Sequence, residues 1–254
     1  MNYLFCIFFL LLGMILGSFY NVVGWRLPKG ESIIYPPSHC PNCNHQLKIL
    51  DLIPVFSFIL QRGKCRYCKN KIAWYYPVFE FLCGIVFMLC YLVFGITPEL
   101  LKALTFVSML IIIMVSDFNY MIIPDEVLLF FGCLLALEIG IIDGYKVLIS
   151  SLINGLIAFV VMYLLKTLGD FMFKKESMGG GDIKLMFIFG LVLGAPLAII
   201  SIFIGSLVGL PISLILLSKN SEHIVPFGPY LSIGATIILL LNIDFNTLIN
   251  FLSH

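Results

Sequence analysis

Charged residues are scarce in this sequence, and that scarcity excludes an ordinary soluble domain. Only 11% of the 254 residues are charged, whereas 61% are hydrophobic, and the mean hydropathy is +1.07. Soluble domains average about 25% charged residues. The composition therefore indicates a membrane protein.

Other absences narrow the class of membrane protein. The apolar runs do not alternate between polar and apolar residues, which excludes transmembrane β-strands. The start, MNYLFCIFF, has no basic residue and no A-x-A-like cleavage site follows, so we expect a retained helix rather than a signal peptide. Neither a G-x-x-x-x-G-K-S/T loop nor a G-x-G-x-x-G turn after a strand is present, so no phosphate or nucleoside site can be drawn from the pattern.

Long apolar runs make up most of the chain. About 20 apolar residues cross the hydrocarbon of a bilayer, where the backbone must satisfy its own hydrogen bonds by forming a helix. We therefore expect an all-α polytopic membrane protein with about eight transmembrane helices and one small polar loop domain. The eight segments lie at about 3–23, 77–95, 102–116, 126–142, 147–168, 183–195, 197–217 and 228–243.

The basic residues predict the orientation of these segments, because cytoplasmic loops collect Lys and Arg. Of the 15 basic residues, only Lys102 and Lys146 fall on the predicted outer side. The others fall on the cytoplasmic side: Arg26, Lys29, Lys48, Arg62, Lys64, Arg66, Lys69, Lys71, Lys166, Lys174, Lys175, Lys184 and Lys219. We therefore expect both termini to lie outside. Membrane topology explains the charge, so we expect no nucleic-acid partner.

Four of the eight cysteines lie in the one sizeable polar region. HCPNC and KCRYC form two C-x-x-C pairs separated by 21 residues, a spacing close to that of four-thiolate zinc sites. Cytoplasmic thiols stay reduced, and so small a loop needs an ion to fold. We therefore expect Cys40, Cys43, Cys65 and Cys68 to bind a structural Zn²⁺, with a redox pair or unrelated thiols as the alternatives.

The neighbouring histidines and the remaining cysteines are expected to play no part in this site. His39 and His45 flank it, but four thiolates already complete a tetrahedral ion. The other cysteines lie inside apolar runs and are expected to pack as small apolar residues: Cys6, Cys83, Cys90 and Cys133.

Two aspartates at the edges of apolar runs are the candidate catalytic residues. Asp117 closes one run, in MLIIIMVSDF, and Asp182 opens another, in GGGDIKLMF. An ionisable residue at the membrane is costly and marks a candidate functional site. The predicted topology places both on the cytoplasmic face. Two nearby carboxylates cannot both ionise easily, so one keeps a proton while the other polarises water, as in an aspartic protease.

The acidic residues also have structural interpretations. Asp125 follows Pro124 in a first helical turn, where a carboxylate suits the helix dipole, so we expect a structural role. Asp182 could be a simple N-cap, although the three glycines before it suit the close approach of another backbone. Glu80, near the cytoplasmic interface, could serve substrate or cofactor, whereas Glu138 lies deeper towards the outside and is unexplained.

Taken together, these features resemble the bacterial type IV prepilin leader peptidases, which are polytopic aspartic proteases of the Gly-x-Gly-Asp type. The resemblance covers nearly the whole chain. It rests on the ordered blocks GSFYNVVGWRLP (Gly17–Pro28), PPSHCPNC, LDLIPVFSFILQRGKCRYCKNKI, YPVFE (Tyr76–Glu80), SDFNYMIIPD, GGGDIKL and PFGPYL (Pro226–Leu231). Asp117 and Asp182 fall on the family's two catalytic aspartates.

The resemblance implies a bifunctional enzyme of the bacterial cytoplasmic (inner) membrane. It would cut the leader from type IV prepilins or pseudopilins in the bilayer, at the cytoplasmic face. It would then N-methylate the new N-terminal residue with S-adenosylmethionine. We accordingly expect a first transmembrane helix (1–23), a cytoplasmic zinc-binding loop domain (24–76) and a transmembrane aspartic peptidase bundle (77–254).

Two other functions fit the sequence less well. A proton-coupled membrane transporter with a regulatory zinc loop would place ionisable residues near the bilayer midplane, but here the strongest candidates gather on one face. A membrane scaffold that binds a partner through its zinc loop would leave the Gly-Gly-Gly-Asp block unexplained. The peptidase is therefore the favoured interpretation.

Overall fold

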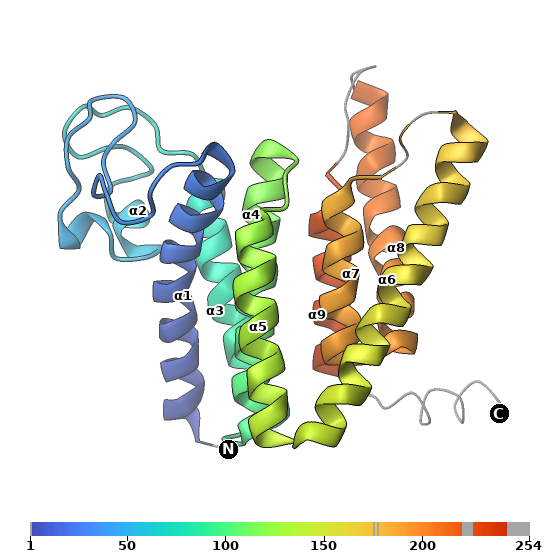
Figure 1. The fold of residues 1–254 in the computed structure, drawn as a ribbon. Coiled ribbons are helices and arrows are strands. Elements are labelled where there is room, and N and C mark those ends of the chain that lie inside the picture. The colour runs from blue at the N-terminus through green and yellow to red at the C-terminus, as the bar shows by residue number, and fades with distance from the viewer. Residues whose placement is uncertain (1, 175, 177, 220–225, 243–254) are drawn as a thin grey trace. The chain divides into compact units, whose positions relative to one another are not determined.

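The computed structural model describes residues 2–174, 176, 178–219 and 226–242. Within these ranges the chain forms helices and loops without a strand (Figure 1), which confirms the all-α prediction. The long helices are α1 (Tyr3–Arg26), α3 (Tyr75–Phe94), α4 (Pro98–Tyr120), α5 (Asp125–Ile142), α6 (Tyr145–Phe173), α7 (Gly180–Leu193), α8 (Ala195–Lys219) and α9 (Gly228–Leu241).

Each of the eight predicted apolar segments coincides with one of these helices. Five of them, α1, α3, α4, α6 and α8, are long and apolar enough to cross a membrane. α7 and α9 have 14 residues each. At about 1.5 Å per residue, a helix of that length is shorter than the roughly 30 Å of hydrocarbon. Eight crossings therefore stay a prediction. The end of the last predicted segment, at residue 243, and the C-terminus predicted to lie outside fall beyond the described residues.

The helix that contains the third predicted segment, 102–116, extends beyond the apolar run at both ends. α4 begins at Pro98 and continues to Tyr120, one turn past the point where polar residues begin. Backbone hydrogen bonding does not depend on side-chain polarity, and the Asn119 amide donates back to the carbonyl of Val115 at 2.6 Å. Asp117 therefore lies inside the last turn of a helix rather than just after one.

The chain divides into two compact units, residues 1–100 and 101–254. In the first unit α1 and α3 pack against each other as antiparallel helices. A Cβ atom added to Gly13 or Gly84 would lie 2.7 Å from a backbone carbonyl oxygen of the facing helix. Small residues let the backbones of membrane helices approach closely, and this packing helps to drive their association because lipid supplies no hydrophobic force between them.

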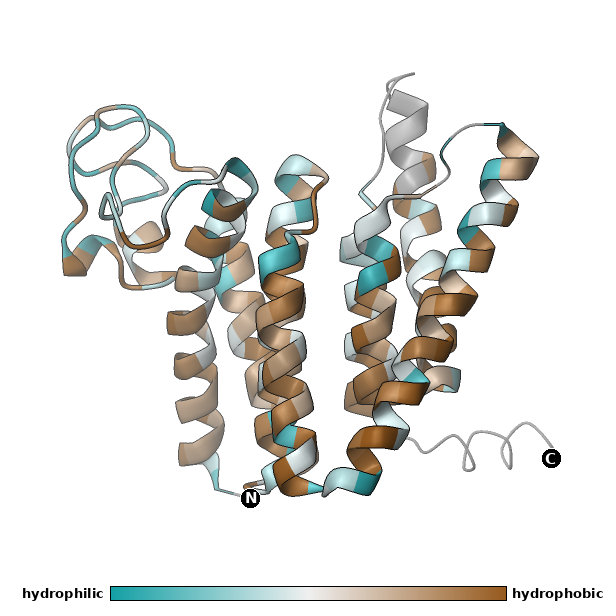
Figure 2. Ribbon diagram, in the orientation of Figure 1, coloured by the Kyte–Doolittle hydropathy of each residue, from teal (hydrophilic) through white to brown (hydrophobic). Residues whose placement is uncertain are grey.

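The polar segment between α1 and α3 holds three short helices. They are η1 (Leu27–Lys29), η2 (Ile49–Asp51) and α2 (Phe56–Leu60). We call residues 30–74 the cysteine loop, because they contain both C-x-x-C pairs. Figure 2 shows that this segment is far more hydrophilic than the helices.

In the second unit α4 contacts several other helices. It is the most buried of the candidate spans, with 78% of its most apolar stretch buried, against 17% for α6. Phe106 of α4 packs edge to face on Phe189 of α7, with ring centroids 5.6 Å apart. The Thr105 hydroxyl donates a hydrogen bond to Glu138 of α5 at 2.8 Å. α6 instead exposes a hydrophobic surface (Figure 2), as a helix facing lipid does.

Candidate functional site

The two C-x-x-C pairs of the cysteine loop converge on one point. The sulfur atoms of Cys40, Cys43, Cys65 and Cys68 all lie within 4.8 Å of one another. The Sγ atoms of Cys40 and Cys68, one from each pair, are 3.8 Å apart. This cluster can hold a metal ion, and the two flanking histidines are not part of it.

Both pairs adopt the same local backbone turn. The N–H of Asn44 donates to the carbonyl of Cys40 at 2.8 Å, and the N–H of Lys69 donates to that of Cys65 at 3.0 Å. Each of these closing residues has a positive φ, 53° for Asn44 and 61° for Lys69. Hydrogen bonds from the backbone N–H groups of Cys68 and Tyr67 lower the pKa of Cys65 to about 7, against the opposing effect of burial. The turn therefore favours the thiolate form of Cys65, the form that binds metal. In the same cluster, burial and hydrogen bonds with the other thiols raise the pKa of Cys68 to about 11.

Asp51 ties the rest of the cysteine loop together. Its side chain is only 1% exposed and pairs with the Arg66 guanidinium at 3.3 Å. It also accepts hydrogen bonds from the Gln61 amide at 3.2 Å and the Tyr67 hydroxyl at 3.3 Å. Gln61, Arg66 and Tyr67 all lie close to the second cysteine pair in the chain, so Asp51 anchors that pair. The sequence analysis did not single out this residue, although an acid between apolar residues in KILDLIP was a usable signal.

The second unit brings Asp117 and Asp182 together. Asp117, in the last turn of α4, is 6% exposed, and Asp182, in the first turn of α7, is 8% exposed. The two carboxyl groups are close enough to interact electrostatically. Helices distant in the sequence thus bring two buried acids within range of an electrostatic interaction. The predicted topology permitted this arrangement, but the sequence alone could not establish it.

Backbone N–H groups hold both carboxyl groups in place. The N–H of Gly228, the first residue of α9, donates to Oδ2 of Asp117 at 2.9 Å. Asp182 accepts a hydrogen bond from the backbone N–H of Gly179. Gly179 occupies the N-cap position of α7, so Asp182 is not the N-cap but sits within the first turn. Gly228 was missed by sequence reasoning about individual residues, although it stands within the quoted PFGPYL block.

The other acids of the second unit have different surroundings. Asp125 is exposed in the first turn of α5 and pairs with Lys184 at 2.7 Å, an arrangement that fits the structural role expected for it. Glu138 is 6% exposed, and among the described residues its Oε2 atom has no hydrogen-bond partner. Neither residue is part of the buried pair described above.

Comparison with known proteins identifies the family. The profile of the bacterial peptidase A24 N-terminal domain matches residues 11–94, and that of the type IV leader peptidase family matches residues 104–214. A prepilin leader peptidase/N-methyltransferase of Bacillus subtilis is 35% identical over 90% of this chain and 91% of its own length. The chain belongs to the type IV leader peptidase family.

Further relatives of this leader peptidase have the same two activities or a related one in their names. A type 4 prepilin-like proteins leader peptide-processing enzyme of Escherichia coli is 32% identical, with 89% of this chain and 91% of the relative covered. A prepilin leader peptidase/N-methyltransferase of Stutzerimonas stutzeri is 31% identical, with coverages of 91% and 89%. No solved structure matches the chain.

Family membership confirms the resemblance predicted from the sequence. This leader peptidase is an enzyme, a protease with N-methyltransferase activity, and a multi-pass protein of the inner membrane. The comparisons give no support to the transporter alternative.

Proposed function

We propose that this leader peptidase removes the leader of type IV prepilins or pseudopilins with Asp117 and Asp182, and then methylates the new N-terminus with S-adenosylmethionine. The observation that supports the peptidase assignment is that two buried carboxyl groups, from α4 and α7, are close enough to interact electrostatically. A pair of carboxyl groups that shares one proton supplies a base and an acid in the same place.

The proposed cleavage uses the two aspartates in complementary roles. The ionised carboxylate accepts a proton from a water molecule as the water oxygen attacks the scissile carbonyl carbon. The protonated partner donates its proton to the carbonyl oxygen, which gives a tetrahedral diol. As the C–N bond breaks, a hydroxyl group of the diol returns a proton to this partner, and the first carboxyl group gives its proton to the leaving amine nitrogen. The N–H of Gly228 fixes Oδ2 of Asp117, which orients the other oxygen of that carboxyl group for the reaction.

Methylation is the second half of the proposal. S-adenosylmethionine supplies an electrophilic methyl carbon on its sulfonium group, which bonds to the freed amine nitrogen as the carbon–sulfur bond breaks and the nitrogen loses a proton. The residues of this chain must therefore bind the donor and bring the neutral amine of the cut substrate to it.

Zn²⁺ is the proposed ion of the cysteine loop. Zn–S bonds of about 2.3 Å in a tetrahedron separate neighbouring sulfur atoms by about 3.8 Å. The Cys40–Cys68 separation of 3.8 Å and the 4.8 Å limit for the whole set fit this ion. Four thiolates leave no open position for a substrate, so the proposed role is structural.

The proposed orientation places the reaction in the cytoplasm. Asp182 and the basic residues Lys174 and Lys184 lie at or near the start of α7, and Lys102 and Lys146 near the starts of α4 and α6. The positive-inside rule then puts the aspartate pair on the cytoplasmic side. In this arrangement residues 1–23 are the first transmembrane helix, residues 24–76 form the cytoplasmic zinc-binding domain, and residues 77–254 form the peptidase bundle.

The proposal is tested with the purified full-length protein, a prepilin with its leader, and S-adenosylmethionine. Mass spectrometry should find a product that has lost its leader and gained a methyl group. Asp117→Asn and Asp182→Asn should each reduce cleavage by about 10²–10⁴-fold or more, because each removes a proton-transferring group. Circular dichroism should find both variants as helical as the wild-type protein.

Asp125→Asn is the matched control, because Asp125 is an exposed aspartate paired with Lys184. It should cleave at nearly the wild-type rate. Full cleavage by Asp117→Asn would remove that residue from the catalytic pair. Cleavage without a methyl gain in the wild-type product would leave the peptidase assignment and contradict the methylation.

A further inference from the structure

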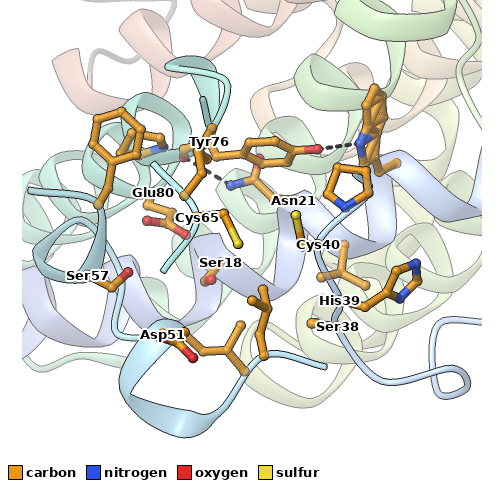
Figure 3. A pocket seen from close by; sticks show the side chains of 18 of the residues that line it. Ser18, Asn21, Ser38, His39, Cys40, Asp51, Ser57, Cys65, Tyr76 and Glu80 are labelled. Atoms are coloured by element: carbon orange, nitrogen blue, oxygen red, sulfur yellow. Dashed lines mark hydrogen bonds between the residues drawn. The ribbon is translucent and has the colours of Figure 1, made fainter. Parts of the chain in front are cut away.

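The first unit contains a cavity whose lining includes neither Asp117 nor Asp182. Its volume is about 320 Å³, within the range of about 300–1,000 Å³ typical of small-molecule sites. Its walls come from α1, from the start of α3 and from the cysteine loop (Figure 3). All of the lining residues belong to residues 18–80, and none belongs to the unit that holds the aspartate pair.

Asn21 of α1 leaves a buried acceptor without a partner at this cavity. The residue is 3% exposed, and its Nδ2 atom donates to the backbone carbonyl of Tyr76 at 3.1 Å. That carbonyl can only accept, so the amide nitrogen must face it and Oδ1 must point elsewhere. Oδ1 has no hydrogen-bond partner among the described residues. A buried, unsatisfied oxygen costs about 1–3 kcal/mol, which a ligand with an N–H donor would offset.

Glu80 of α3 supplies a carboxylate that is held firmly at the same cavity. One of its oxygens accepts the backbone N–H of Val55 at 2.8 Å, and the Ser18 hydroxyl also hydrogen-bonds to it. Val55 has a φ of 61°, a conformation that β-branched residues rarely adopt. The carboxyl group of Glu80 is thus fixed by partners from both the cysteine loop and α1. Within the described residues, no basic side chain forms an ion pair with it.

An aromatic wall completes the cavity. The indole Nε1 of Trp25 donates to the hydroxyl of Tyr76 at 2.6 Å, and the centroids of the two rings lie 6.2 Å apart, nearly edge to face. The hydrogen bond locks both rings in position. The Nζ atom of Lys29 lies over one face of the Trp25 ring, 4.9 Å from its centroid. A planar heterocycle would therefore stack on the ring surface that Lys29 leaves open.

We infer that this cavity is the binding site for S-adenosylmethionine in the proposed methylation, so this assignment rests on the proposed function. The ligand has an adenine amine that can donate to Oδ1 of Asn21. Its sulfonium and ammonium groups are cations that suit the carboxylate of Glu80, and its purine ring suits the aromatic wall. The N-terminal profile, which matches residues 11–94, covers all of the residues that line the cavity, and the peptidase profile covers none of them. Methylation in the first unit, separate from cleavage by the aspartate pair in the second unit, accounts for both the cavity and the division into two profiles.

The test measures binding of S-adenosylhomocysteine, the unreactive product, to the full-length protein by isothermal titration calorimetry. Glu80→Gln keeps the shape and the acceptor for Val55 but removes the charge, and should weaken binding about 10-fold or more. Asn21→Leu removes the unpaired oxygen and should weaken it about 5-fold. Both variants should still cleave prepilin and keep their zinc, because neither touches the aspartate pair or supplies a thiolate.

Glu126→Gln is the matched control, since Glu126 is an exposed glutamate of the second unit, and it should bind as the wild type does. Wild-type affinity in both cavity variants would overturn the assignment while leaving the proposed function intact. A wild-type protein that cleaves prepilin but binds neither S-adenosylmethionine nor its product would contradict the methyl donor of the proposed function itself, and the cavity assignment with it.

A second measurement covers the case in which a variant loses zinc and misfolds. Ultraviolet crosslinking of methyl-labelled S-adenosylmethionine to the wild-type protein, followed by peptide mapping, should place the label within residues 18–80. Excess unlabelled S-adenosylhomocysteine should abolish it. A competed label found only within residues 101–254 would overturn the cavity assignment without any substitution.

Discussion

At the scale of single residues, the aspartate pair depends on a glycine that carries no functional group. Gly228 brings its N–H to 2.9 Å from Asp117 Oδ2, and a Cβ atom at this position would lie 2.8 Å from the same oxygen. Any larger residue would therefore displace the carboxyl group or the start of α9. The sequence contained the glycine within a recognisable block, but nothing in the block indicated that its backbone faces Asp117.

Replacing this glycine should damage the reaction more than the fold. Gly228→Ala should lower the rate of prepilin cleavage about a hundredfold, since a displacement of about 1 Å in a reacting group has that effect. Gly132→Ala is the control, because a Cβ at Gly132 would make only an ordinary contact, 3.4 Å from Ile188. Cleavage kinetics and thermal unfolding of both variants check this. Equal rates for Gly228→Ala and the wild type would contradict the positioning role.

At the scale of elements, the cysteine loop has little regular structure and depends on cross-links. Its two turns are short, and its helices η2 and α2 have 3 and 5 residues. The loop exposes large apolar side chains such as Ile49 and Leu60, so it lacks a core of its own. The buried Asp51 network holds part of it together, and the proposed zinc ion would join its two C-x-x-C pairs.

Loss of one thiolate should therefore unfold the loop without unfolding the helices. The wild-type protein should bind about one zinc ion per chain, and Cys65→Ser should abolish this binding. The substitution should also make residues 30–74 sensitive to proteases, because structural zinc supplies folding energy. Cys133→Ser is the control, since Cys133 is an exposed cysteine of α5 outside the cluster. Mass-spectrometric metal analysis and limited proteolysis measure both effects. Full zinc content in Cys65→Ser would exclude Cys65 as a ligand.

At the scale of the whole molecule, two compact units correspond to two sequence profiles. The units meet at residues 100 and 101, and the profiles end and begin at residues 94 and 104. The proposed sites follow this division, with the donor cavity in the first unit and the aspartate pair in the second. Both units would have to present their sites on the same side of the membrane for one substrate to visit both.

The predicted orientation of the chain can be checked by labelling cysteines in intact cells. In a chain that lacks Cys6 and Cys133, Thr97→Cys, between α3 and α4, should react with a membrane-impermeant maleimide added outside. Ile122→Cys, between α4 and α5, should react only after the cells are opened, because the positive-inside rule places that loop in the cytoplasm. Both positions are exposed. The reverse pattern would invert the orientation and move the aspartate pair outside.

The sequence by itself determined the features that depend on local composition. Apolar run length predicted all eight helices, because a backbone in lipid must hydrogen-bond within its own segment. The C-x-x-C spacing predicted the four-sulfur cluster, because a short turn brings both thiols of a pair to one point. The ordered blocks predicted the family.

Only the tertiary structure decided the features that depend on helix packing. It brought Asp117 and Asp182 together, placed the Gly228 N–H on Asp117, and buried Asn21 with an unpaired oxygen at a cavity. It also extended α4 past its apolar run, since a helix continues as long as its backbone bonds do. These contacts join residues up to 111 positions apart, and hydropathy or spacing along the chain carries no information about which faces of two distant helices will meet.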